Sequence, residues 1–193
     1  MSQREHVAAL KGLLHAGPDG RRLHSVPGCW DGLTALLVER AGFPITFLSG
    51  GALSMGRYGS PDMGLVTASE VAQAVAVIRD RIAIPLIVDA DTGFGNALTL
   101  QRSLRAFERA GASAVQIEDQ ILPKKCGHLN DKHLATAEDA ARKIAAAVAA
   151  RRHLLVVART DAAAESLDEA IRRANLYLEA GADIIFPDAL VSD

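Results

Sequence analysis

Acidic side chains stand at the ends of two short apolar runs, where they could hold a metal ion. Asp89 and Asp91 close the run that starts at residue 86, and Glu118 closes the run at 114–118. Residues two apart on an extended strand point to the same side, so the two aspartates would meet and favour a cation between them. Oxygen ligands without a histidine cluster suit Mg²⁺ or Mn²⁺ rather than zinc, and Glu118 would complete the set directly or through water. The alternative is that these are solvated loop acids or helix N-caps.

A second set of residues has the chemistry that holds carboxylate or phosphate oxygens. Ser49-Gly50-Gly51 offers a hydroxyl and bare backbone N–H groups after the run at 45–48. Arg159 follows the run at 154–158 and carries a planar, permanently charged guanidinium group suited to a carboxylate. Each of these also fits a structural turn or a salt bridge when it is taken alone.

Two glycine-containing segments differ in what they predict. The segment 92–96 (Thr-Gly-Phe-Gly-Asn) lacks the full dinucleotide-binding pattern, so we expect a tight turn close to the ligand, or a plain strand-to-helix turn, rather than an NAD site. Lys124-Lys125-Cys126-Gly127-His128 combines a thiol with two ammonium groups and an imidazole. Positive neighbours lower the pKa of a thiol, and the glycine would let the segment act as a closing lid. The alternative is an exposed basic loop with an incidental cysteine.

Apolar runs that alternate with helical periodicity indicate the elements that position these residues. The runs predict strands at 23–27, 45–48, 86–89, 114–118, 154–158 and 184–187. The periodicity predicts helices at 31–41, 68–81, 98–110, 137–151 and 167–180. Thr67 and Glu70 have the spacing of a capping box, and three helices stop at an Ala-Gly pair, where glycine can take the left-handed C-cap conformation.

The Ala-Gly stops form a weak internal repeat, because each precedes an apolar run. A repeated strand–helix unit predicts an α/β fold with parallel strands, either a doubly wound sheet or a barrel. The polar residues fall at the carboxyl ends of successive strands, where such folds build their sites. Six strands are visible, whereas an eight-stranded barrel needs about 250 residues. The pattern therefore allows either an open sheet or a barrel that lacks its last quarter to third.

Composition and charge argue against several classes of protein. The chain of 193 residues is 49% hydrophobic and 4% aromatic, which suits one domain with a parallel sheet under Ala-rich helices. A net charge of −2 with interspersed signs makes no stripe for nucleic acid and no polybasic membrane patch. Two cysteines make no disulfide framework, and Cys29 is expected to pack in the core. With no signal peptide and no membrane span in the sequence, we expect a cytoplasmic protein.

At these motifs the sequence resembles the isocitrate lyase / phosphoenolpyruvate mutase superfamily. Within it, the chain is most similar to the short methylisocitrate lyase-like and 2,3-dimethylmalate lyase-like proteins. The matching segments run in family order over nearly the whole chain. They are Val26-Pro27-Gly28 with Asp31, Leu48-Ser49-Gly50-Gly51, Pro61-Asp62, Val88-Asp89-Ala90-Asp91-Thr92-Gly93-Phe94-Gly95, Ile117-Glu118-Asp119-Gln120, Lys124-Lys125-Cys126-Gly127-His128, Ala158-Arg159-Thr160-Asp161 and Ile185-Phe186-Pro187.

The resemblance implies a (β/α)8 TIM barrel with Mg²⁺, or Mn²⁺, at its mouth, here truncated after the sixth strand. Residues 1–193 would then be a single (β/α) barrel domain without strands seven and eight and the terminal helices. By motif match the metal-site acids are Asp89 and Asp91, with Glu118 and Asp62 around them, through water. The residues that would hold the substrate are Ser49, Gly50, Gly51, Arg159 and Gly127. The expected catalytic residues are Cys126, Lys124, Glu118 and His128.

The implied reaction is Mg²⁺-dependent cleavage of a carbon–carbon bond in a 2-hydroxy di- or tricarboxylate of the methylisocitrate or dimethylmalate type. The retro-aldol step would give an α-keto acid and a carboxylate. Cys126 would protonate the carbanion, with Lys124 or a water linked to Glu118 as the candidate base. Phe47 stands where methylisocitrate lyases have tyrosine and Asp188 where the family usually has glutamate, so the resemblance leaves the substrate open.

Other functions fit the same fold. One is oxaloacetate hydrolysis or decarboxylation, and another is a phosphonomutase acting on a carboxyphosphonoenolpyruvate-like substrate. A third is an inactive, truncated barrel that only binds a ligand. For the full-length protein we expect a homodimer or homotetramer that binds a small hydroxy- or oxo-carboxylate, with neither nucleic acid nor a membrane as partner.

Overall fold

Six parallel strands form one sheet whose spatial order follows the chain. The computed structural model describes residues 2–15, 23–127, 129 and 131–190. The strand order is β1-β2-β3-β4-β5-β6, and every pairing is parallel. A doubly wound sheet reverses its order at a switch point, whereas a barrel does not. The expected α/β class with the strand order of a (β/α) barrel is therefore confirmed. The strands are β1 Gly28–Cys29, β2 Thr46–Leu48, β3 Leu86–Asp89, β4 Ala114–Glu118, β5 Leu155–Thr160 and β6 Ile184–Pro187.

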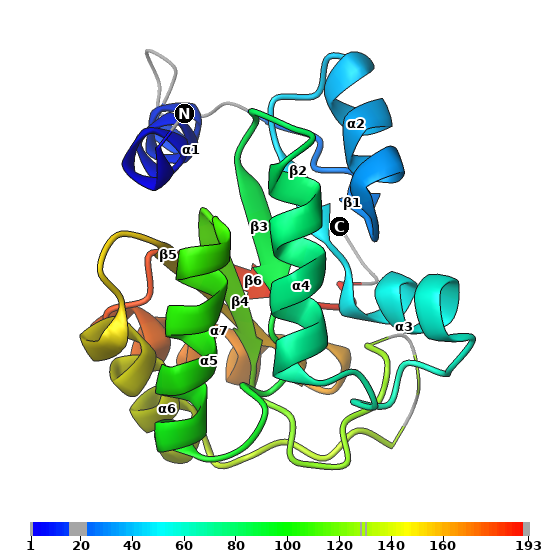
Figure 1. The fold of residues 1–193 in the computed structure, drawn as a ribbon. Helices are drawn as coiled ribbons and strands as arrows, with labels where there is room; N and C mark the ends of the chain where they lie inside the picture. Colours follow the sequence, from blue (N-terminus) through cyan, green and yellow to red (C-terminus); the bar gives the residue numbers. More distant parts are fainter. Residues whose placement is uncertain (1, 16–22, 128, 130, 191–193) are drawn as a thin grey trace.

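Helices cover the outer face of the sheet in the same sequential order. Helices α2, α4, α5, α6 and α7 each pack against the next along the chain, and Figure 1 shows α4 and α5 lying in front of the strands, with α6 beyond α5. The segment between β4 and α6 crosses the lower edge of that view (Figure 1). The helices are α1 Gln3–His15, α2 Gly32–Arg40, α3 Gly50–Tyr58, α4 Ala68–Arg79, α5 Ala97–Ala110, α6 Ala137–Ala150, the short 3-10 helix η1 Ala162–Ala164, and α7 Leu167–Glu179.

The alternation along each strand divides its side chains between two environments. Leu48, Val88 and Ile117 point outward and are fully or almost fully buried beneath the helices. Their neighbours Phe47 and Ile87 instead face a hollow of about 380 Å³ on the inner face of the sheet. Helix α1 packs across the starting ends of the strands, where its apolar residues meet strand residues in a second, smaller core. The carboxyl ends of the parallel strands lie at the opposite edge of the sheet from α1.

The helix-boundary signals of the sequence are confirmed. Thr67 and Glu70 form a reciprocal capping box at the start of α4. Gly42, Gly111 and Gly181 follow α2, α5 and α7 with φ of 87°, 104° and 97°, values that a residue with a Cβ adopts at a steric cost. These stops place each following strand at a defined distance from its helix.

One sequence prediction of local structure is wrong, and helix α3 was not predicted. The first strand is Gly28–Cys29 and not 23–27, since Leu23 is 98% exposed and Pro27 has no N–H to donate to a sheet. Ser49-Gly50-Gly51 is not a plain loop, because the two glycines are the first turn of α3 and Ser49 is its N-cap, accepting a hydrogen bond from Ala52 N at 3.2 Å. The first turn of a helix needs no intrahelical N–H partners, so glycine is tolerated there.

In the portion of the chain that the structure describes, the helices all fall short of the length and hydropathy that a membrane span requires.

Candidate active site

Asp89, the last residue of β3, and Asp91 lie close together, as predicted. The reason is not that they point to the same side of an extended strand. The strand ends at Asp89, and the backbone turns so that Asp91 adopts φ of 46°, a left-handed conformation that aspartate tolerates better than most residues. Asp91 N donates to Asp89 Oδ1 at 3.1 Å, and Asp91 O accepts from Glu118 N at 2.9 Å. The turn itself therefore brings the carboxyl groups together and holds them beside the end of β4.

The start of α3 lies against these carboxyl groups. Gly50 N donates to Asp89 Oδ2 at 3.2 Å. A Cβ on Gly50 would stand 3.1 Å from Asp89 Oδ2, and a Cβ on Gly51 would stand 2.8 Å from Asp62 Oδ2. A Cβ at either position would push a carboxylate aside, so the two glycines let these carboxylates approach the backbone. The predicted metal-site acids and the predicted substrate loop thus share one space, at the positive end of a helix dipole.

Lys124 places its ammonium group among these acids. Its Nζ pairs with Asp62 and lies 2.7 Å from Asp91 Oδ1, and the residue is only 3% exposed. Burial by itself would lower the pKa of Lys124, but the charge of Asp91 and the hydrogen bond to Asp62 raise it above its usual range. The same burial, together with the charge of Asp89, raises the pKa of Asp91 to about 6. Lys124 is therefore a fixed positive charge in this arrangement.

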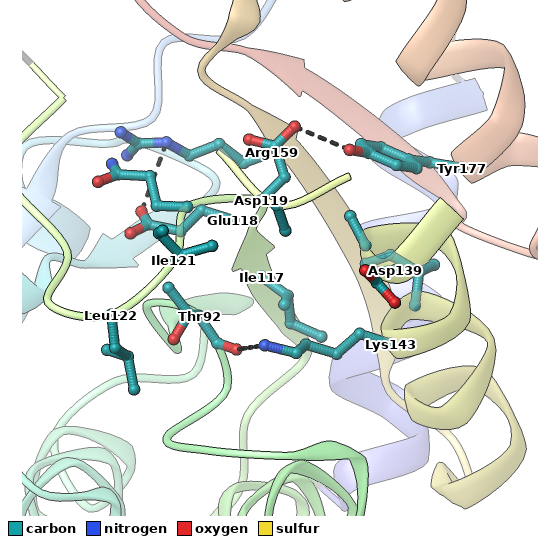
Figure 2. Close-up of a pocket in the computed structure, with 14 residues that line it drawn as sticks. Thr92, Ile117, Glu118, Asp119, Ile121, Leu122, Asp139, Lys143, Arg159 and Tyr177 are labelled. Atoms are coloured by element: carbon teal, nitrogen blue, oxygen red, sulfur yellow. Dashed lines mark hydrogen bonds and ion pairs between the residues drawn. The ribbon is translucent and has the colours of Figure 1, made fainter. Parts of the chain in front are cut away.

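Glu118 and Arg159 face each other across the ends of β4 and β5. Arg159 Nε lies 3.7 Å from Glu118 Oε2, as the dashed line in Figure 2 shows. Glu118 Oε1 is buried and has no hydrogen-bond partner. Burial raises the pKa of Glu118 to about 9, and only part of that rise is offset by Arg159. A pocket of about 230 Å³ borders Glu118 and is lined by residues of β4 and α6.

Arg159 is held by carboxylates on three sides. Its Nε and Nη2 donate to Asp161 at 3.1 and 2.9 Å, and its Nη2 also donates to Asp188 Oδ2 at 3.0 Å. Burial opposes the charge of this guanidinium, yet Asp161, Glu118 and Asp188 together raise its pKa above the usual value. A planar, permanently charged group in a fixed orientation is suited to binding a substrate carboxylate.

The Cys126-Gly127 segment packs directly over that arginine. A Cβ on Gly127 would collide with Asp188 Oδ2 and Arg159 Nη2. Cys126 is partly exposed, in contrast to Cys29, which is fully buried in the core as expected. The neighbouring ammonium groups are engaged elsewhere, because Lys124 pairs with aspartates and Lys125 Nζ donates to Asp131 O at 3.0 Å. The predicted catalytic residue His128 lies outside the described residues.

The donor set fits a hard divalent cation. Asp62, Asp89, Asp91 and Glu118 supply four carboxyl groups to one region in which Lys124 is the shared positive charge. The unpartnered oxygen of Glu118 is the orphan acceptor that such a site would explain. Within the described ranges, no three acidic, histidine or cysteine side chains stand as a ready-made metal-binding group. Mg²⁺ would suit this arrangement, because it binds one or two carboxylates and keeps several waters.

The sequence did not indicate the two buried aspartates that orient Arg159, one directly and one through the other. Asp161 is fully buried and receives Lys132 Nζ at 3.0 Å as well as Arg159. Asp119 accepts hydrogen bonds from Thr160 Oγ1 at 2.7 Å and from Asp161 N at 3.0 Å. Asp119 and Asp161 both stand in the segments quoted for the resemblance, but nothing in their spacing indicated that one supports the other.

The sequence profile of phosphoenolpyruvate phosphomutase matches residues 12–193. A 2-methylisocitrate lyase of Aeropyrum pernix is 54% identical over 167 residues, which are 86% of this chain and 54% of that protein. A solved 2,3-dimethylmalate lyase, a member of the PEP mutase/isocitrate lyase superfamily, superposes with a TM-score of 0.88 at 31% identity, over 97% of this chain and 63% of that one.

A solved complex of phosphonopyruvate hydrolase with oxalate and Mg²⁺ is also similar. It superposes with a TM-score of 0.86 at 36% identity, over 100% of this chain and 65% of that one. The chain thus spans between about half and two thirds of the length of these relatives. The profile match, the identities and the TM-scores agree with one another. The chain therefore belongs to the phosphoenolpyruvate phosphomutase family, within the isocitrate lyase/PEP mutase superfamily.

Proposed function

We propose that the full-length protein is a Mg²⁺-dependent carbon–carbon lyase that cleaves a 2-hydroxy di- or tricarboxylate into an α-keto acid and a carboxylate. The observation that carries the proposal is the acidic cluster of Asp89, Asp91 and Glu118, in which Glu118 lies 3.7 Å from the mostly buried Arg159, against which Gly127 packs. The identity to a 2-methylisocitrate lyase and the likeness to a 2,3-dimethylmalate lyase support the same reaction class.

Substrate binding would use the charges that are already in place. Arg159 would take one carboxylate of the substrate, because its guanidinium is fixed by Asp161 and keeps its charge at every accessible pH. The N-terminal turn of α3, at Ser49, Gly50 and Gly51, would add backbone N–H groups and the positive end of the helix. Mg²⁺, held by Asp89 and Asp91, would act as a Lewis acid that polarises the hydroxyl and carboxylate oxygens of the substrate.

The bond cleavage needs one proton removed and one proton delivered. A base takes the proton of the substrate hydroxyl, the oxygen forms a carbonyl, and the electron pair of the broken C–C bond moves to the carbon beside the other carboxylate. Cys126 would donate its thiol proton to that carbon. Of the two candidate bases, Lys124 is held as an ammonium by Asp62 and Asp91, so its amine is not free to take the proton. A water linked to Glu118 would serve once Glu118 is ionised, which a bound divalent cation would favour.

The test is release of pyruvate or glyoxylate by the full-length protein, measured in a coupled assay with methylisocitrate, isocitrate and dimethylmalate. Cys126→Ser should lower kcat by about 100-fold or more, since the alcohol is a far weaker acid than the thiol and general acid catalysis is worth about that factor. Cys29→Ala is the matched control, because that thiol is fully buried in the hydrophobic core. Full activity of Cys126→Ser on every cleaved substrate would show that the proposed acid is wrong.

The substrate itself depends on the inner hollow. Phe47 and Asp188 line it together with Arg159, and these are the two positions at which the chain departs from its resemblance. Oxaloacetate and phosphonopyruvate belong in the same panel, because a phosphonopyruvate hydrolase shares this fold and 36% of the aligned residues. Turnover of either one, without cleavage of a 2-hydroxy acid, would replace the lyase assignment.

The assembly and location of the protein are part of the same proposal. We expect the full-length protein to be a cytoplasmic homodimer or homotetramer. Both cysteines are free thiols, which suits a reducing compartment. Light scattering of the full-length protein gives the oligomeric state directly.

A further inference from the structure

Lys132 makes two contacts that join separate parts of the candidate site. Its Nζ donates to Gly127 O at 2.6 Å and to Asp161 Oδ1 at 3.0 Å. The side chain of Lys132 is 8% exposed and that of Asp161 is fully buried. An ammonium group placed in this way has been removed from water, so the two oxygens that receive it determine where it lies.

The contacts continue from Asp161 to Arg159. Asp161 Oδ1 accepts from Arg159 Nη2 at 2.9 Å and Asp161 Oδ2 from Arg159 Nε at 3.1 Å, so one carboxylate receives both cations. Gly127 is also against Arg159 on its other side, where a Cβ would collide with Nη2. The contacts therefore form a closed ring that includes the segment carrying Cys126. Its members are Lys132, Asp161, Arg159 and Gly127.

We infer that Lys132 is a positioning residue for the site: its ammonium group fixes the Gly127 carbonyl to the carboxylate that orients Arg159. These two hydrogen bonds of Lys132, called the Lys132 tie below, set the position of Cys126, one residue before Gly127, relative to Arg159. The inference rests on the proposed function only for its kinetic consequence, because the tie itself is a matter of structure.

The first experiment tests the Lys132 tie through the alkylation rate of Cys126, which requires no substrate turnover. Cys126 is partly exposed and Cys29 is fully buried, so slow alkylation of the native protein by iodoacetamide reports on Cys126. Lys132→Met should raise the alkylation rate about fivefold, because local opening of a segment becomes easier when its contacts are lost. Lys132→Arg should restore part of the protection, since guanidinium can donate to both oxygens. Lys11→Met, at an exposed lysine of α1, is the control for loss of one positive charge.

The second experiment separates positioning from binding. With the substrate that the full-length protein cleaves, Lys132→Met should lower kcat about tenfold through misplacement of the thiol. KM should change less than about threefold, because Arg159 keeps its two bonds to Asp161. Thermal unfolding of each variant shows whether the fold is intact, and Lys132→Arg provides the folded comparison if Lys132→Met is unstable.

The outcomes separate this inference from the proposed function. Faster alkylation in Lys132→Met, partly restored in Lys132→Arg, supports the tie even if no substrate in the panel is cleaved. Alkylation at the wild-type rate in Lys132→Met, or an equal rise in Lys11→Met, overturns it. A KM effect larger than the kcat effect also overturns it, since Lys132 would then act on substrate binding rather than on the placement of Cys126.

Discussion

Replacement of Asp119 by asparagine should destabilise the protein strongly, although the two side chains have almost the same shape. Asp119 Oδ2 accepts from Thr160 Oγ1 at 2.7 Å, from Tyr177 OH at 2.8 Å and from Arg173 Nη1 at 3.0 Å. Asp119 Oδ1 accepts from Asp161 N at 3.0 Å. Both oxygens are therefore acceptors, and Asp119 is only 3% exposed. Figure 2 shows the contact with Tyr177.

Asparagine can replace only one of the two oxygens as an acceptor. If its carbonyl takes the Oδ2 position, its NH₂ group faces the N–H of Asp161, and a buried donor without a partner costs about 1 to 3 kcal/mol. Arg173 also loses its buried counter-charge, and breaking such a pair costs about 3 to 5 kcal/mol. Because Arg173 keeps a second partner in Glu169 at 2.8 Å, we expect a total near the lower limit, about 3 kcal/mol.

The measurement is urea unfolding at pH 7, compared at constant m-value. Glu169→Gln is the matched control, because it removes the other carboxylate of Arg173 at a position that is 34% exposed, and such a pair is worth at most about 1 kcal/mol. A loss below about 1 kcal/mol in Asp119→Asn, or an equal loss in the control, would refute the argument that Asp119 is the buried hub.

Three further predictions concern the site. Gly127→Ala should weaken the binding of a carboxylate ligand about tenfold, since the added methyl group displaces Arg159 or Asp188; calorimetry with oxalate measures the dissociation constant, and unchanged affinity would contradict this. In chelator-treated protein, burial raises the pKa of Glu118 from 4.5 to about 9, so the folded state keeps a proton that the unfolded chain releases. Stability should therefore fall as the pH rises from 4.5 to about 9, and Glu118→Gln should flatten that slope in thermal melts, whereas an unchanged slope would show that another group is responsible. Asp89→Asn should abolish the rise in melting temperature that Mg²⁺ gives the wild type, because a metal that binds only the folded state stabilises it; an equal rise in both proteins would place the metal elsewhere.

The local elements were largely predictable from the sequence. The capping box of Thr67 and Glu70 and the left-handed Gly111 depend on neighbours within four residues, so the pattern alone locates them. The first strand and α3 were not predicted. Pro27 lies in the apolar run but cannot donate to a sheet, and Gly50 with Gly51 reads as a loop although both lie in the first turn of a helix.

The acids at the strand ends could be identified from the sequence alone, because their order along a parallel (β/α) chain is also their order along the mouth of the sheet. The partners of these acids became evident from the three-dimensional fold. Lys124 pairs with Asp62 across 62 positions, and Lys132 with Asp161 across 29. Such pairs depend on strand register and on where a loop crosses the sheet, and buried charges select their partners by distance in space rather than by spacing along the chain.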